Sequence, residues 1–279
     1  MAIYLNDQFL ENDEARLHIS DLSIQRGYGI FDFLRTVNGI PLFIDDHLNR
    51  FYASADVMRL PVRKTREELS SIIHELIRRS SLAEAGIRIM LTGGYSTDGY
   101  TPSEPNLVIS CSSVKVSLQK DFEKGISIIT YEHQRELPHI KSINYLMAVW
   151  LQPWLKEKQA NDLLYHKNNT ITEFPRSNVF IVTPDNKLVT PVRNILKGIT
   201  RKNILSFAEK IMQVEQRDIT VDELLSASEV FLTATTKKIM PVLQINNKIA
   251  GNGKPGPVTT TLYNKFLELE RSALHLVSR

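Results

Sequence analysis

Residues 139–145 read His-Ile-Lys-Ser-Ile-Asn-Tyr, and this stretch decides how the rest of the chain is interpreted. Lys141 lies between Ile140 and Ile143, at the entrance of a predicted apolar helix. An ammonium group that is partly removed from water in such a place has a lowered pKa and can act as a nucleophile. A single lysine is most often a solvated surface group. Lys141 therefore needs support from other parts of the sequence.

Three later stretches carry polar groups next to predicted helices or strands. In residues 169–180, Glu173 comes just before a predicted strand. In residues 195–201 (Ile-Leu-Lys-Gly-Ile-Thr-Arg), Thr200 stands at the mouth of a predicted helix, where free backbone N–H groups and a threonine cap form an anion site. Residues 232–236 (Leu-Thr-Ala-Thr-Thr) offer hydroxyl and N–H groups after a strand. Taken alone, these are an ordinary solvated glutamate, a capped helix and a polar loop.

The spacing of apolar residues predicts an α/β protein. Apolar residues recur at helical spacing from Thr65 to Ser80, and Thr65 with Glu68 forms a capping box at the start of this helix. Cys111 is the single cysteine, so it forms no internal disulfide and is expected in a buried strand. Further helices are predicted at residues 45–58, 144–158, 200–212, 221–226 and 257–271, and strands at residues 88–92, 107–111, 127–131, 178–182 and 229–233.

Composition and charge exclude several classes of protein. The 279 residues are 42% hydrophobic and 23% charged, which is typical of a folded chain with a large core. The net charge of +3 is small and the basic residues are scattered, so nucleic acid is a poor candidate partner. The N-terminus has no signal-peptide pattern, and no stretch of about 18 apolar residues occurs. We expect a cytoplasmic protein with no membrane partner and no metal site.

A polar, aperiodic stretch from Ser112 to Lys124 separates two parts of the chain. It predicts an N-terminal α/β domain at residues 1–115, an interdomain linker at residues 116–125 and a second α/β domain at residues 126–279. Lys141, Glu173 and the other polar stretches described above all fall in the second domain of this division.

The order and spacing of these stretches resemble the class IV (fold-type IV) aminotransferases that depend on pyridoxal 5′-phosphate (PLP). This family contains branched-chain and D-amino-acid aminotransferases and aminodeoxychorismate lyase. The resemblance runs from residues 5–7 through residues 47–50 (His-Leu-Asn-Arg) to residues 241–242, and so covers nearly the whole chain. It implies an α/β (α+β) fold with a smaller N-terminal α/β domain and a larger, barrel-like C-terminal domain that binds PLP. It also implies a homodimer with shared active sites.

The family's cofactor residues have counterparts in this chain. Lys141 matches the lysine that forms a Schiff base with PLP, and Glu173 matches the carboxylate that faces the pyridine nitrogen. A carboxylate there keeps the ring nitrogen protonated, so the cofactor can accept electrons from the substrate α-carbon. Lys141 would then shuttle the proton between the α-carbon and C4′. The resemblance further implies Arg50 at the phosphate, Ile199, Thr200 and Thr235 as donors around it, and Tyr145 near O3′.

The substrate residues depart from the two familiar patterns of the family. Branched-chain enzymes resemble Tyr-x-Arg where residues 86–88 of this chain read Gly-Ile-Arg, so the arginine is kept and the tyrosine is lost. Familiar D-amino-acid enzymes carry an arginine and a histidine where this chain has Asp98 and Tyr100. Branched-chain enzymes carry a tyrosine at the position of Arg26, and the resemblance implies that this residue reaches the neighbouring subunit's site.

Arginine is unusually frequent at the expected substrate positions. Arg176 stands three residues after Glu173, where small residues are more usual in the family. Planar guanidinium groups bind carboxylates through paired hydrogen bonds. The alternative is that Arg26 and Arg176 pair with nearby Asp or Glu residues as structural salt bridges. The expected substrate residues are Arg26, Phe31, Arg88, Arg176 and Thr236.

The resulting hypothesis is a D-amino-acid aminotransferase that uses 2-oxoglutarate and D-glutamate. Arg26 and Arg88 would hold the α-carboxylate, with Arg176 a partner for the distal one. In this family the lysine acts from one face of the cofactor. The configuration of the amino acid that reacts, D or L, therefore depends on which side of the pocket holds its α-carboxylate. The first alternative is an L-branched-chain aminotransferase, in which Arg88 serves the side-chain carboxylate of glutamate. The others are an aminodeoxychorismate lyase and a non-catalytic PLP-binding protein.

Overall fold

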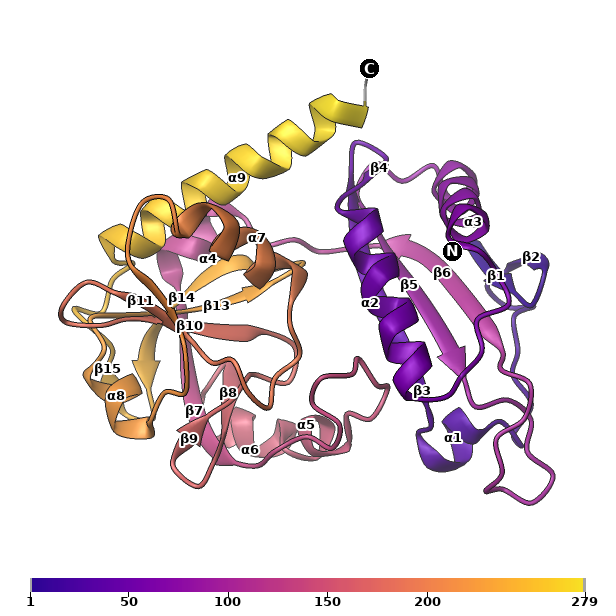
Figure 1. The fold of residues 1–279 in the computed structure, drawn as a ribbon, viewed down its shortest axis with the longest axis horizontal. Helices are drawn as coiled ribbons and strands as arrows, with labels where there is room; N and C mark the ends of the chain where they lie inside the picture. The colour runs from indigo at the N-terminus through magenta and orange to yellow at the C-terminus, as the bar shows by residue number, and fades with distance from the viewer. Residues whose placement is uncertain (1, 278–279) are drawn as a thin grey trace. The chain divides into compact units, whose positions relative to one another are not determined.

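The computed structural model describes residues 2–277, and the chain forms two compact units (Figure 1). Unit 1 contains residues 2–115, 140–144 and 272–277, and unit 2 contains residues 116–139 and 145–271. The division predicted from the sequence assigns residues 126–279 to one domain. In the structure, the five residues around Lys141 cluster with unit 1 instead.

Unit 1 is built on a six-stranded antiparallel sheet with the strand order β2-β1-β6-β5-β3-β4. Its strands are β1 (Ala2–Leu5), β2 (Gln8–Glu11), β3 (Gly29–Val37), β4 (Ile40–Pro41), β5 (Ala85–Thr92) and β6 (Leu107–Ser113). Its helices are α1 (Leu22–Arg26), α2 (Ile44–Val57) and α3 (Arg66–Ser80). Helices α2 and α3 cover one face of this sheet (Figure 1).

Strand β3 gives its alternate side chains to the two faces of the sheet. Ile30 and Leu34 are fully buried and belong to the core beneath α2 and α3. Phe31 and Phe33 point to the opposite face, where Phe33 is paired directly with Arg88 of β5. This second face therefore combines aromatic and cationic side chains, whereas the first face is largely apolar.

Residues 140–144 run along the start of β3. The N–H of Phe31 donates to the Lys141 carbonyl at 2.9 Å, and the N–H of Ile143 donates to the Gly29 carbonyl at 3.1 Å. Gly29 must lack a side chain, because a Cβ there would lie 2.8 Å from the carbonyl oxygen of Leu91. These contacts fix the backbone of Lys141 against unit 1.

Unit 2 is built on a nine-stranded mixed sheet that curls into a half-barrel. Its strand order is β12-β11-β10-β13-β14-β7-β8-β9, with β15 paired to β14. The strands are β7 (Ile126–Glu132), β8 (Asp162–Lys167), β9 (Thr170–Ile171), β10 (Asn178–Val182), β11 (Leu188–Thr190), β12 (Val214–Gln216), β13 (Glu229–Ala234), β14 (Lys238–Ile245) and β15 (Lys248–Ile249). The helices are α4 (Gln119–Lys124), α5 (Leu146–Trp150), α6 (Gln152–Glu157), α7 (Ile199–Ala208), α8 (Val221–Ser226) and α9 (Pro257–Val277). This mixed architecture of two sheets confirms the predicted fold class.

Strands β10 and β13 form the buried middle of the second sheet. Phe180 and Phe231 are direct partners, and their rings stack with centroids 5.1 Å apart. At the other end of the pair, Asn178 at the start of β10 lies opposite Thr233 near the end of β13. The polar stretches that contain Glu173 and Thr235 therefore meet at the same end of these two strands.

Several predicted elements are confirmed and others need correction. Helix α3 has the predicted capping box, in which the Thr65 hydroxyl accepts from the Glu68 N–H and the Glu68 carboxylate accepts from the Thr65 N–H. Cys111 is buried in β6, as expected. The single helix predicted at residues 144–158 is wrong, because the chain forms two short helices that meet at Leu151. The stretch 112–124, predicted as a linker, contains helix α4.

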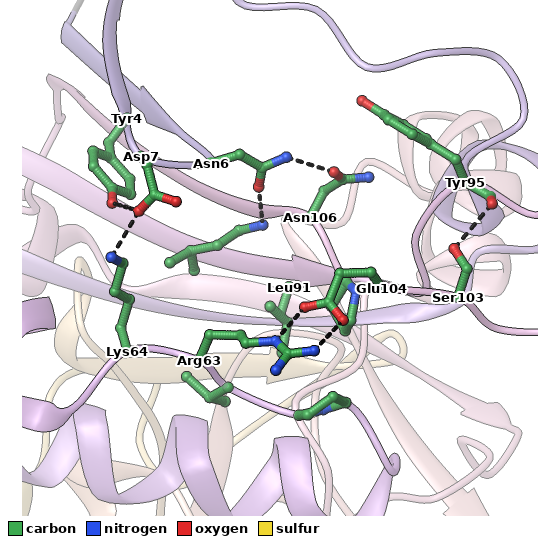
Figure 2. A pocket seen from close by; sticks show the side chains of 14 residues that line it. Tyr4, Asn6, Asp7, Arg63, Lys64, Leu91, Tyr95, Ser103, Glu104 and Asn106 are labelled. Atoms are coloured by element: carbon green, nitrogen blue, oxygen red, sulfur yellow. Dashed lines mark hydrogen bonds and ion pairs between the residues drawn. The ribbon is translucent and has the colours of Figure 1, made fainter.

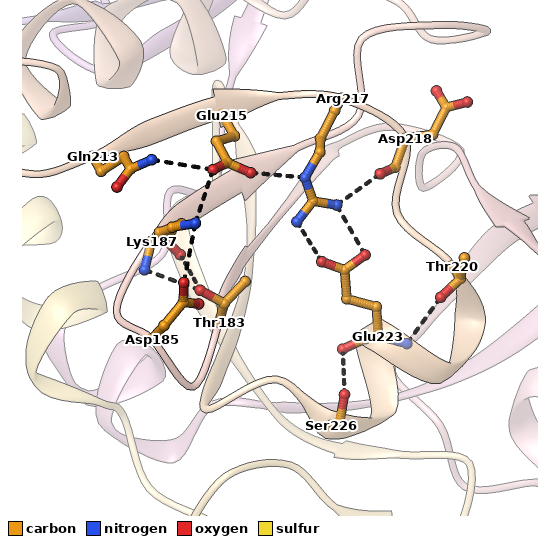
Figure 3. A network of polar contacts seen from close by, with 10 residues as sticks. All are labelled: Thr183, Asp185, Lys187, Gln213, Glu215, Arg217, Asp218, Thr220, Glu223 and Ser226. Atoms are coloured by element: carbon orange, nitrogen blue, oxygen red, sulfur yellow. Dashed lines mark hydrogen bonds and ion pairs between the residues drawn. The ribbon is translucent and has the colours of Figure 1, made fainter.

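Ion pairs on the surface of unit 2 join the end of β12 to α8 (Figure 3). Arg217 donates to both carboxylate oxygens of Glu223, at 2.9 and 2.5 Å, and to Glu215 at 2.8 Å. Lys187 also pairs with Glu215 at 3.3 Å. The Arg217 side chain is 40% exposed, so each pair stabilises the fold by at most about 1 kcal/mol. Within residues 2–277, no helix is long and apolar enough to cross a membrane.

Candidate active site

Lys141 is held on the aromatic face of unit 1. Its side chain is partly buried, and its Nζ lies 4.6 Å from the centroid of the Phe31 ring. Its backbone N–H donates to the Ser54 hydroxyl of α2 at 3.4 Å. An ammonium over an aromatic face is partly shielded from water. The nucleophilic role that the sequence predicts for Lys141 stays a proposal.

Arg50 is oriented by a buried carboxylate that the sequence analysis missed. Asp32 on β3 is fully buried and accepts from Nε of Arg50 at 2.8 Å and from Nη2 at 2.9 Å. His47 Nδ1 lies 2.6 Å from the same carboxylate. Nη1 of Arg50 donates to no residue in the described range. Arg50 therefore keeps one edge of its guanidinium available for an anion.

The charges in this cluster follow from burial and proximity. Burial alone would raise the pKa of Asp32, but Arg50 and His47 outweigh it and hold the pKa well below its usual range. Burial lowers the pKa of His47, and the charges of Arg50 and Lys141 add to this effect, while Asp32 opposes it. We therefore treat Asp32 as ionised and His47 as neutral at pH 7.

Arg88 is cationic and has no acidic partner among residues 2–274. Its Cζ lies 4.9 Å from the centroid of Phe31 and 5.9 Å from that of Phe33. Its guanidinium donates no hydrogen bond and forms no ion pair with a side chain in that range. Phe31 thus carries both the Lys141 ammonium and the Arg88 guanidinium on its ring. The structure brings these three predicted residues together in unit 1.

The loop after β5 replaces the arginine and histidine of familiar D-amino-acid enzymes. Asp98 accepts hydrogen bonds from the N–H and the hydroxyl of Thr101, from the N–H of Tyr100 and from the Ser96 hydroxyl, and these bonds hold the pKa of Asp98 well below its usual range. Asp98 therefore orders its own loop. The Tyr100 side chain is 82% exposed.

Arg26 lies at the end of α1, beside this loop. Its Nη1 donates to the Gln25 carbonyl at 2.9 Å, and a Cβ built on Gly99 would lie 3.5 Å from its Nη2. Arg176 is exposed in unit 2. Neither arginine forms an ion pair with a described carboxylate, so the structural salt bridges considered as the alternative are absent from the described part of the chain.

Glu173 is buried in unit 2 and both of its oxygens are occupied. Oε1 accepts from Nε of Arg135 at 2.9 Å, and Oε2 accepts from the Leu196 N–H at 2.9 Å. Arg135 also donates to the Pro138 carbonyl at 2.6 Å. Arg135 therefore ties the carboxylate to the turn that leads into the lysine segment.

The N-terminus of α7 fits an anion, although its cap differs from the prediction. Gly198 is the N-cap residue and has no side chain with which to cap the helix, so Thr200 lies inside the first turn and is not the cap. Asn178 accepts from the Gly198 N–H at 3.1 Å. Its partner Thr233 faces the same side of the sheet, and the Thr233 hydroxyl is buried without a partner in the described chain. Buried polar groups are normally satisfied, so a ligand with acceptor oxygens fits here.

The other predicted residues of unit 2 lie near this position in the chain. Ile199 and Thr200 are buried in the first turn of α7. Thr235 and Thr236 follow β13 and are partly buried. Tyr145 is the residue before α5 and is also partly buried. The predicted roles of these five residues stay proposals.

Three functional candidates were absent from the sequence analysis as individual residues: Asp32, His47 and Arg135. His47 and Arg50 are three residues apart on α2, a spacing that places both on one helix face. That spacing could have indicated a shared acidic partner. Nothing in the local sequence around Arg135 indicates its contact with Glu173, which lies 38 residues away in the chain.

A cavity in unit 1 is separate from the predicted site (Figure 2). Its volume is about 530 Å³, and it is lined by residues of β1, the turn at residues 61–64 and the stretch 103–107. Its charged groups pair with one another, Arg63 with Glu104 at 2.6 Å and Lys64 with Asp7 at 2.7 Å. It contains none of the predicted site residues. No group of three or more described His, Cys, Asp or Glu side chains could hold a metal ion.

Comparison with known proteins decides the family. The family described as "Amino-transferase class IV" matches residues 29–245. The chain is a class IV aminotransferase. It is 30% identical to the D-alanine aminotransferase of Staphylococcus haemolyticus, over 97% of this chain and 99% of that one. It is 31% identical to the D-alanine aminotransferase of Bacillus licheniformis, over 96% and 98%. It is 29% identical to the putative branched-chain-amino-acid aminotransferase of Methanocaldococcus jannaschii, over 96% of each.

Solved structures agree on the fold of this aminotransferase. The branched-chain amino acid aminotransferase of Escherichia coli superposes with a TM-score of 0.89 at 24% identity, covering 96% of this chain and 94% of that one. A PLP-bound hypothetical aminotransferase of Mycobacterium tuberculosis gives a TM-score of 0.85 at 20% identity, covering 98% and 99%. Class IV aminotransferases use PLP and act on amino and oxo acids, so the predicted cofactor and reaction type are confirmed. D-alanine and branched-chain relatives match at nearly the same identity, so family membership does not select the substrate.

Proposed function

We propose that this aminotransferase moves amino groups between D-amino acids and 2-oxoglutarate, with PLP held covalently by Lys141. The observation that carries the proposal is the position of Arg88. Its donors meet no described acceptor, and it shares the Phe31 ring with the Lys141 ammonium. A guanidinium in such a place suits the carboxylate of a substrate that reacts at the lysine.

Each predicted cofactor residue has a definite task in this proposal. When bound, PLP supplies an electron sink for the substrate α-carbon. Glu173 holds a proton on the pyridine nitrogen, and Arg135 keeps that carboxylate in place. Lys141 Nζ would take the proton from the substrate α-carbon and deliver it to C4′ of the cofactor. The phosphate is held by the Nη1 edge of Arg50, by the N–H groups of Ile199 and Thr200, and by the Thr235 hydroxyl.

Preference for D-amino acids follows from where the α-carboxylate binds. The tyrosine that assists one side of the pocket in branched-chain enzymes is replaced by Gly86 in this chain. A second arginine, the partner subunit's Arg26, strengthens the other side together with Arg88. Because the lysine acts from one face of the cofactor, a substrate anchored on this side presents its α-hydrogen correctly when it has the D configuration. Arg176 is proposed to meet the distal carboxylate of glutamate.

The competing function is L-branched-chain transamination. The similarity to the putative branched-chain-amino-acid aminotransferase of Methanocaldococcus jannaschii supports this alternative. A coupled assay with 2-oxoglutarate as acceptor separates the two. We expect turnover of D-alanine and D-glutamate at least about 100-fold faster than that of L-leucine, which corresponds to roughly 2.7 kcal/mol. Turnover of L-leucine alone would refute the assignment of configuration. Release of pyruvate from aminodeoxychorismate without an amino acceptor would instead indicate the lyase.

The assembly and location of the protein belong to the same proposal. We infer a cytoplasmic homodimer, because a contribution of the partner's Arg26 requires two copies. Sedimentation equilibrium should give twice the chain mass. A second test mixes Arg26→Ala subunits with Lys141→Ala subunits. Activity should appear in the mixture, because one of the two hybrid sites has both Lys141 and the partner's Arg26, and its absence would contradict shared sites.

A further inference from the structure

Two strands of unit 1 place Phe33 and Arg88 side by side. In the antiparallel pairing of β3 and β5, Phe33 lies opposite Arg88, Phe31 lies opposite Met90, and Arg35 lies opposite Gly86. Directly paired residues point to the same face of a sheet, so Phe33, Arg88 and Gly86 share one face. This is the face that carries Lys141 over the Phe31 ring.

The Phe33 ring occupies the space above Gly86. A Cβ built on Gly86 would lie 2.7 Å from Cζ of Phe33 and 2.9 Å from its Cε2. The Cβ of Val114 limits the same space at 3.3 Å. Any side chain at position 86 would therefore push the Phe33 ring away. The glycine at position 86 and the aromatic ring at position 33 are a matched pair.

Arg88 leans away from Gly86 and toward the lysine. Its Cζ is nearer to the Phe31 centroid, at 4.9 Å, than to the Phe33 centroid, at 5.9 Å, although Phe33 is its direct partner across the strands. Phe33 leans in the opposite direction along the strands, over Gly86. The two side chains thus pass each other diagonally, and Phe33 fills the space into which Arg88 would otherwise swing.

We propose that Phe33 is a positioning residue that directs Arg88 toward the substrate carboxylate nearest to Lys141, the α-carboxylate. With its ring over Gly86, Phe33 blocks the side of Arg88 that faces away from the lysine. The guanidinium is then held against Phe31 with its donors free. This inference rests on the proposed function and specifies its substrate class: amino acids need only one carboxylate to engage Arg88, so donors without a distal acid are accepted.

The size of the effect follows from the contact that is lost. A cation near an aromatic face is attracted by the ring, more weakly at exposed sites than where both groups are shielded from water. Arg88 is exposed in the single chain. Phe33→Ala should therefore weaken carboxylate binding by about fivefold, or roughly 1 kcal/mol.

A double-mutant cycle tests the proposal on the PLP-loaded enzyme. The probes are propionate, with one carboxylate, and glutarate, with two, because neither has an amino group to react. Dissociation constants are measured by calorimetry for the wild type, Phe33→Ala, Arg88→Ala and the double variant. We expect about fivefold weaker propionate binding for Phe33→Ala in the wild-type background and less than twofold in the Arg88→Ala background.

Two further variants keep the test decisive if Phe33→Ala folds poorly. Gly86→Ala should displace the Phe33 ring and weaken propionate binding to a similar extent, while Phe33→Tyr should retain binding within about twofold. The matched control is Phe9→Ala, because Arg79 lies 4.2 Å from the Phe9 centroid at the β2 edge of the same sheet. It removes a comparable cation–aromatic contact and should leave propionate binding unchanged.

The outcomes separate this inference from the proposed function. Equal weakening by Phe33→Ala in both Arg88 backgrounds would mean that Phe33 does not act through Arg88, and unchanged binding in the wild-type background would overturn the proposal as well. Weakened binding of glutarate alone would assign Arg88 to the distal carboxylate and also refute it. The preference for D-alanine over L-leucine is measured independently by turnover, so either claim can fail alone.

Discussion

The predicted functional residues of unit 1 and the central one of unit 2 carry opposite charges. In unit 1 the functional groups are the cations of Lys141, Arg50 and Arg88, and the two arginines keep donors that meet no described acceptor. In unit 2 the central group is the carboxylate of Glu173, both of whose oxygens are already bonded. Unit 1 is therefore suited to bind anionic groups, whereas unit 2 holds the carboxylate of Glu173 in a fixed position.

The two units also differ in what holds these functional groups. In unit 1, Asp32 is fully buried and holds Arg50 through two hydrogen bonds. Arg135 holds the carboxylate of unit 2 in the reverse arrangement. In each unit a residue of opposite charge orients the functional group. Variants of these residues can therefore test each unit separately.

The largest effect on activity is expected when Glu173 of unit 2 loses its negative charge. Glu173→Gln keeps the size of the side chain but cannot hold a proton on the pyridine nitrogen, so kcat should fall by about 10³-fold. Steady-state kinetics with saturating PLP measures this. The control is Glu136→Gln, an exposed residue next to Arg135, which should retain wild-type kcat. A kcat within about threefold of wild type for Glu173→Gln would contradict the role of the Glu173 charge in catalysis.

The corresponding change in unit 1 is Asp32→Asn. Removing one partner of a buried ion pair costs about 3–5 kcal/mol, and the loss of orientation at Arg50 should weaken PLP binding. Pyridoxal, which lacks the phosphate, should bind equally well to the variant and the wild type. Fluorescence titration of the apoenzyme with both compounds measures the difference. Equal weakening for pyridoxal would show that Asp32 only stabilises the fold.

The stability that Asp32 contributes to the wild type should decrease as the pH falls. The folded state holds the pKa of Asp32 below its usual value, so the unfolded chain takes up a proton first as the pH falls. The stability from Asp32 is therefore complete above about pH 4 and is lost below it. Urea unfolding should show the gap between wild type and Asp32→Asn beginning to narrow as the pH falls from 7 to 3, because the pKa of folded Asp32 lies well below its usual range. Asp56→Asn, an exposed change on the same helix, is the matched control.

Much of the fold of both units could be predicted from the sequence. The capping box of α3 and the apolar runs of β10 and β13 are local patterns, and they have the expected structure. Strand β3 escaped prediction because it is buried on both faces and contains Asp32 and Arg35, so neither alternation nor a continuous apolar run marks it. Asp32 is stabilised there by His47 and Arg50, which lie 15 and 18 residues further along the chain.

The candidate site was predictable where the family motif carries it and not where tertiary contacts do. Lys141, Glu173 and Arg50 stand in recognisable stretches. Asp32 and Arg135 orient two of them through contacts 18 and 38 residues apart in sequence. Such contacts depend on strand pairing and loop packing, for which one sequence gives no direct pattern.

A smaller effect should appear in the acid stability of unit 1. Burial lowers the pKa of His47 below about 6.5, so the unfolded chain binds a proton before the folded chain does as the pH falls. Stability should therefore decrease below pH 6.5, by at most about 1.4 kcal/mol per pH unit. His47→Asn should reduce this slope between pH 7 and pH 5 in urea unfolding. His74→Asn, at an exposed position of α3, should keep it, and identical slopes for both variants would contradict the neutral state of His47.

The smallest effect is expected on the surface of unit 2, away from the functional residues. Arg217→Met removes the pairs with Glu215 and Glu223, and because these groups are partly exposed the loss should be about 1 kcal/mol. The Tm should fall by about 2–4 °C, with kcat and PLP affinity unchanged. Calorimetry in 1 M NaCl should reduce the difference, because salt screens exposed pairs. A change in PLP affinity would show that this network influences the site.

The most direct test of the account asks which amine holds the cofactor. PLP-loaded enzyme is reduced with borohydride and digested, and peptide mass spectrometry locates the phosphopyridoxyl group. We expect the added mass on the peptide that contains Lys141, and no added mass in the Lys141→Ala variant. Modification of a different lysine in the wild type, or none at all, would contradict the central claim.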